Sequence, residues 1–154
     1  MEFTDDQLAA IDVFLVGLAI LADLDAVLPS NYTLEDVRQL LLDAISSEET
    51  VRSEPTSEDD LVADLAVHFE DDAAALDGAA VVLARRYVVG ELDWETADAL
   101  INDCWTPKLH AKSWPAIADA VYLAFDAGEV AQSLHRQDPN ATTAPLVLEL
   151  LDSV

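Results

Sequence analysis

The sequence predicts an all-α protein, a helical bundle of about seven helices with no sheet. Apolar residues recur at spacings of three and four, which is the pattern of one helix face. No segment alternates apolar and polar residues over the length of a strand, and capping residues precede most of the apolar runs. The 154 residues suit one domain. We therefore expect a single acidic helical domain over residues 1–154, with a subdomain seam in the loop 46–60.

Two helices are expected in the first 45 residues. Thr4 and Gln7 form a capping-box pattern that starts a helix reaching about Leu24. The segment Val13–Leu24 is apolar on every side except Asp23, which is typical of a helix surrounded by others or of a dimer contact. Thr33 then caps a second helix, whose apolar positions share one face: Leu34, Val37, Leu41 and Ile45.

A third helix is expected from Ser57 or Glu58, with Leu61, Leu65 and Phe69 facing inward. The fourth covers Ala73–Val89, has a potential interruption at Asp77-Gly78 and stops at Gly90.

Three more helices follow. Asp93 caps the fifth, whose apolar stripe is Trp94, Ala97, Ile101 and Cys104, and a loop from Trp105 to Lys112 comes next. Ser113 caps the sixth, with Pro115 in its first turn and Gly128 at its end. The last helix begins after Thr143, with Pro145 in its first turn and Leu146–Leu151 behind it.

The charge of the chain excludes several classes of partner. With 31 acidic and 7 basic side chains, the formal net charge is −24. Proteins bind nucleic acid by neutralising phosphates with Lys and Arg, so we expect no nucleic acid partner and no anionic membrane partner. The longest apolar run, Val13–Ala22, is too short to span a membrane, and the N-terminus is acidic, so we expect a cytoplasmic protein.

The acidity is uneven along the chain. Residues 85–114 hold 5 acids and 4 bases, whereas the other 124 residues hold 26 acids and 3 bases. The same near-neutral window contains all three tryptophans. Trp94 and Trp114 fit core positions on helix stripes, whereas the loop from Trp105 to Lys112 offers an aromatic and cationic edge. Its candidate residues for binding a partner or ligand are Trp105, Lys108, His110 and Lys112.

No catalytic residue and no cofactor is predicted. The four glycines are scattered, so a phosphate-binding loop is absent from the sequence. Cys104 is the single cysteine and lies on an apolar stripe, which favours an inert thiol over a nucleophile paired with His110. We predict no metal site, although Asp64, His68 and Asp72 would share one face if a single helix carried them.

Part of the chain resembles a known group of proteins. The segments that carry the resemblance are 87–100, 114–129, Asp138-Pro139 and 143–146, and Ala-Phe-Asp-Ala-Gly-Glu at 124–129 is the most specific. Residues 87–151 thereby resemble small uncharacterised bacterial proteins, some of which are similar to the immunity proteins of bacterial toxin systems. The resemblance implies that this chain inhibits a protein partner, and it assigns no functional residue.

Three functions follow, in order of preference. The first is a non-enzymatic interaction protein that covers a basic protein surface, such as an immunity-type inhibitor. The second is a salt-adapted cytosolic protein whose acidity reflects its habitat. The third is an enzyme or metal-binding bundle that uses Asp64, His68 and Asp72. A homodimer through Val13–Leu24 or Leu146–Leu151 is compatible with each of them.

Overall fold

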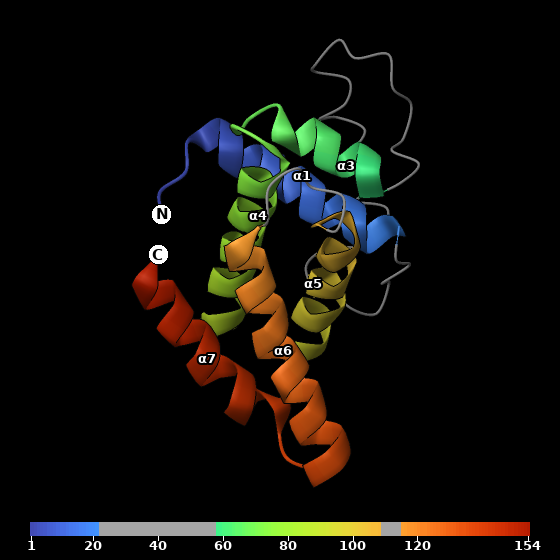
Figure 1. Cartoon of the computed structure of the whole chain (residues 1–154), viewed down its shortest axis with the longest axis vertical. Coiled ribbons are helices and arrows are strands. Elements are labelled where there is room, and N and C mark those ends of the chain that lie inside the picture. The colour runs from blue at the N-terminus through green and yellow to red at the C-terminus, as the bar shows by residue number, and fades with distance from the viewer. Residues whose placement is uncertain (22–57, 109–114) are drawn as a thin grey trace.

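A computed structural model describes residues 1–21, 58–108 and 115–154 of the chain (Figure 1). These residues form helices and no strand, which confirms the all-α class. They hold six helices where about seven were predicted, and the helix predicted from Thr33 lies outside the described residues, as does most of the loop 46–60. The helices are α1 (Asp5–Leu21), α3 (Glu58–Ala66), α4 (Asp72–Val88), α5 (Trp94–Lys108), α6 (Ala116–His135) and α7 (Pro139–Ser153).

Helix α4 is the centre of the bundle and contacts each of the other five helices (Figure 1). Many of its buried positions are alanines, whose small side chains let neighbouring helices approach closely. The helix runs without a break through Asp77-Gly78, so the predicted interruption is wrong. Gly78 is buried against the rings of Phe69 and Phe3, and this packing offsets the low helix propensity of glycine, about 1 kcal/mol relative to alanine.

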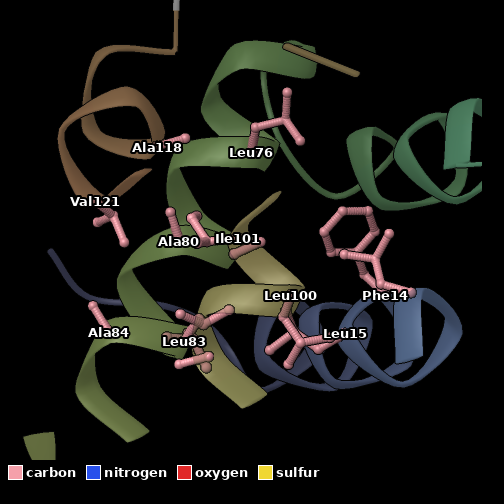
Figure 2. Close-up of a cluster of buried hydrophobic side chains, with 14 of the residues drawn as sticks. Phe14, Leu15, Leu76, Ala80, Leu83, Ala84, Leu100, Ile101, Ala118 and Val121 are labelled. Carbon is pink, nitrogen blue, oxygen red and sulfur yellow. The ribbon is translucent and has the colours of Figure 1, made fainter. Parts of the chain in front are cut away.

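One hydrophobic core joins all six helices. Its largest fully buried side chains include Phe14 from α1, Leu65 from α3, Leu83 from α4, Ile101 from α5 and Phe125 from α6. Figure 2 shows the part of this core to which α1, α4, α5 and α6 contribute. The described part of the apolar segment 13–24 packs Phe14, Leu15 and Leu18 into this core. The core therefore accounts for much of the apolar excess of α1.

Two of the predicted helix starts are confirmed by their hydrogen bonds. The backbone N–H of Thr4 donates to Gln7 Oε1 (3.0 Å), and the N–H of Gln7 donates to Thr4 Oγ1 (3.1 Å), which is a reciprocal capping box. At α5, the N–H of Thr96 donates to Asp93 Oδ1 (2.8 Å). Both caps involve residues three apart, so local sequence was sufficient to find them.

The start of α6 depends on a residue from another helix. Pro115 occupies the N-cap position and supplies no side-chain hydrogen bond, while the predicted cap Ser113 lies outside the described residues. Instead, the N–H of Ala118 donates to Asp77 Oδ1 on α4 (2.8 Å). Burial raises the pKa of Asp77, although hydrogen bonds from the backbone at Ala118 and Ile117 oppose this shift.

The prediction that Gly128 ends α6 is wrong. The helix continues to His135 and ends at Arg136, which adopts the left-handed conformation (φ 50°) that commonly terminates helices. Gly128 is buried at the contact between α6 and α7, where a Cβ would lie 2.9 Å from Trp94 Nε1 and closer still to Thr143 Oγ1. The close contact between the helices therefore explains the glycine at this position, and a helix end does not.

Helix α7 also starts earlier than predicted. Asp138 caps it by accepting a hydrogen bond from the N–H of Asn140 (3.0 Å), and Pro139 is its first residue, where a missing N–H costs nothing. Pro145 therefore lies inside the helix and not in its first turn. Thr143, one turn into the helix, is completely buried.

Among the helices that the structure describes, none has the length and apolar character needed to cross a membrane. The two ends of the chain meet, because the terminal ammonium of Met1 donates to the carbonyl of Val154 (2.6 Å).

Candidate interaction surface

The alternative metal site required Asp64, His68 and Asp72 to lie on one continuous helix, and that prediction is wrong. Helix α3 ends at Ala66, His68 lies in the following turn, and Asp72 is the first residue of α4. The turn is closed by a hydrogen bond from the N–H of His68 to the carbonyl of Leu65 (3.1 Å), and Gln7 Nε2 donates to the carbonyl of His68 (3.1 Å). Tertiary packing of this turn against α1 thus competes with helix continuation. Within the described residues, no group of three or more potential ligands is arranged to hold a metal ion.

The first four residues of the predicted binding loop, 105–108, are helical. Helix α5 extends through Trp105 to Lys108, so these two candidates lie in its last turn. The other two, His110 and Lys112, lie outside the described residues.

Two of the four basic residues in the near-neutral window hold the N-terminal segment against α4. Arg85 Nη2 donates to the carbonyl of Met1 (2.7 Å), and its guanidinium lies 5.7 Å from the ring centroid of Phe3. Arg86 pairs with Asp12 on α1. These contacts assign both arginines to packing between elements.

Trp94 is a core residue, as its helix stripe predicted. It is 6% exposed, and its ring lies 6.2 Å from that of Phe125. Its Nε1–H donates to Thr143 Oγ1 (2.9 Å), and that hydroxyl donates to the carbonyl of Ala124 (3.0 Å). The chain of two hydrogen bonds joins α5, α7 and α6 and satisfies every polar atom in it.

A cluster of carboxyl groups lies where α5 meets α6. Asp98 from α5 forms a side-chain hydrogen bond with Glu129 of α6, and the charge of Asp126 acts on the same group. Burial, followed by these two neighbours, raises the pKa of Asp98 to about 7. Partial burial and the surrounding carboxylates also raise the pKa of Tyr122. We call Asp98, Asp126 and Glu129 the carboxyl cluster.

This cluster makes the stability of the fold depend on pH. Because the pKa of Asp98 is about 7 in the folded protein and about 4 in an unfolded chain, the folded state binds the extra proton between these values. The free energy of unfolding is therefore expected to fall as the pH rises from about 4 through 7. A cation placed beside the pair would replace the shared proton and relieve the repulsion.

Sequence reasoning did not find the carboxyl cluster. Asp98 and Glu129 are 31 residues apart on different helices, and the chain has 31 acidic residues, so no spacing distinguishes this pair. Only the packing of α5 against α6 brings them together (Figure 1).

Comparisons of the chain with protein-family models, with curated proteins and with solved structures found no match.

Proposed function

We propose that the protein is a non-enzymatic acidic interaction protein that binds and covers a basic protein surface in the cytoplasm. The observation that carries this proposal is the charge: outside residues 85–114, 26 acids stand against 3 bases. Helices hold carboxylates at fixed positions, and a field of one sign accelerates the association of an oppositely charged partner. The carboxyl cluster supports the proposal, because its members repel one another unless a proton or a cation lies between them.

In its more specific form, the proposal is that the partner is a toxin and that this protein is its immunity-type inhibitor. The support is the resemblance over residues 87–151, which correspond to the end of α4 and to helices α5, α6 and α7. The carboxyl cluster lies within this part of the chain.

A salt-graded pull-down tests the proposal. The full chain, immobilised through a tag, should recover a defined basic protein at about 0.1 M salt and lose most of it at about 0.5 M, because screening shortens from about 10 Å to a few ångströms. An unrelated helical protein of similar net charge is the control for nonspecific capture. Recovery of neutral or acidic proteins alone would contradict the proposal.

Salt adaptation is the second candidate, and one observation favours it. The chain contains 20 Asp and 11 Glu but only two Lys, and such a composition suits a cytosol at molar salt, where self-repulsion is screened. Circular dichroism as a function of KCl separates the two candidates. Unfolding at 50 mM salt would favour adaptation, whereas unchanged stability between 50 mM and 2 M would exclude it.

A further inference from the structure

Part of the outward face of α6 is apolar. Leu123, Val130 and Leu134 follow one another at spacings of seven and four, so at 100° per residue they lie within about 40° of each other around the helix. They are 54%, 43% and 72% exposed. We call these three residues the α6 stripe.

The α6 stripe is additional to the buried face of the same helix. Val121 and Phe125, which point into the core, are completely buried and lie on the other side of α6. A surface helix usually presents polar residues opposite its buried face. Isolated exposed leucines are common on proteins, but three aligned along one helix form a continuous apolar strip.

Carboxylates flank the α6 stripe on the side that faces α5. Asp126 lies on α6 next to the stripe, and Glu129 lies further round, where it meets Asp98. Between Ala116 and Leu134 the helix contains no Lys or Arg. An apolar strip bordered by negative charge is complementary to a helix that carries its own apolar strip bordered by Lys or Arg.

We propose that the α6 stripe, together with the carboxyl cluster, is the docking surface for a basic amphipathic helix of the partner protein. The proposal rests on the proposed function and specifies the part of the surface that it uses. A second copy of this chain is a poor occupant, because it would oppose carboxylates to carboxylates on a protein with a net charge of −24. The apolar side chains of the partner helix would cover the α6 stripe, and its Lys or Arg side chains would lie against Asp98, Asp126 and Glu129.

A designed peptide tests this surface without knowledge of the natural partner. The probe is a labelled 15-residue peptide of leucine and lysine, with leucines at helical spacing on one face, and an isomer of the same composition in scrambled order is compared with it. We expect the full chain to bind the amphipathic peptide about tenfold more tightly than the isomer in fluorescence anisotropy, since covering the stripe requires the leucines on one face.

Variants locate the binding surface. Leu123→Ser and Leu134→Ser should each weaken binding of the amphipathic peptide about threefold to tenfold, because each removes an apolar contact from an exposed position. Leu148→Ser is the matched control: Leu148 is 51% exposed and belongs to α7, not to the α6 stripe, and its replacement should change affinity less than twofold. The double variant Asp126→Asn, Glu129→Gln should reduce the dependence of binding on salt.

The outcomes separate this inference from the proposed function. Tight binding of both peptides with no effect of the stripe variants would overturn the docking surface and leave the acidic interaction protein standing. No binding of either peptide would overturn both. Self-association in sedimentation experiments that Leu134→Ser abolishes would assign the stripe to a second copy of the chain and overturn the basic partner.

Discussion

Replacement of Gly128 by alanine should destabilise the protein, although alanine is the better helix former. The Cβ of an alanine would lie 2.9 Å from Trp94 Nε1 and 3.2 Å from Trp94 Cζ2, and would overlap Thr143 Oγ1. None of these atoms moves freely, because the Trp94 indole donates to the Thr143 hydroxyl, which donates to the carbonyl of Ala124. Both side chains are buried, at 6% and 0% exposure.

The expected change in unfolding free energy combines two costs and one gain. Overpacking a core contact costs about 1–3 kcal/mol. Separation of α6 from α7 lengthens the hydrogen bond from the Thr143 hydroxyl to the carbonyl of Ala124, and a buried donor without its acceptor costs about 1–3 kcal/mol. Higher helix propensity returns about 1 kcal/mol. The net loss of unfolding free energy is about 3 kcal/mol, or a fall in Tm of about 6–12 °C for a domain of this size.

Urea denaturation measures this effect when the wild type is compared with Gly128→Ala, Thr143→Ala and the double variant. Removal of the Thr143 hydroxyl relieves the overlap, so the double variant should lose less stability than the sum of the two single changes. A Gly128→Ala variant more stable than the wild type by about 1 kcal/mol would show that Gly128 is an ordinary helix position. Strictly additive effects would refute the close contact with Thr143.

Three further predictions use the same denaturation assay. Asp77→Ala should cost about 1–2 kcal/mol because α6 loses its cap, and Asp77→Asn, which keeps an acceptor oxygen, should cost less; equal costs would argue against the cap. Asp98→Asn should reduce the fall in unfolding free energy between pH 5 and 8, because the asparagine amide donates to Glu129 at every pH. The expected reduction is about 1–2 kcal/mol, a value that is lowered because the pair is partly hydrated. Asp152→Asn, which changes the charge equally at an exposed position of α7, should leave that dependence unaltered, and identical profiles for both variants would contradict the proton-sharing pair. Thr4→Ala should cost about 1 kcal/mol through loss of the capping box, and no loss would mean that water replaces the hydroxyl.

Most of the fold could be predicted from local patterns. The reciprocal bonds of Thr4 and Gln7 and the cap at Asp93 join residues three apart, so their residue types alone identify them. The apolar stripe of α5 placed Trp94 and Ile101 in the core correctly. Glycine and proline were less informative, because each has several structural uses.

The candidate site was harder to predict than the fold. The alternative metal site assumed one continuous helix, and the turn after Ala66 removes that geometry. The α6 stripe was missed because the sixth helix was expected to end at Gly128. Had the helix been continued to Leu134, the spacing of Leu123, Val130 and Leu134 would have revealed the stripe.

The sequence by itself determined the helical class, two helix starts, much of the core and the excess of negative charge. These features depend on residue type and on spacings of three or four residues, which act along one helix. The tertiary structure alone decided that Gly128 lies inside a helix, that Asp77 caps a helix other than its own, and that Asp98 meets Glu129. Each of these results depends on which helices pack together and how closely, and those distances are set by side chains far apart in the chain.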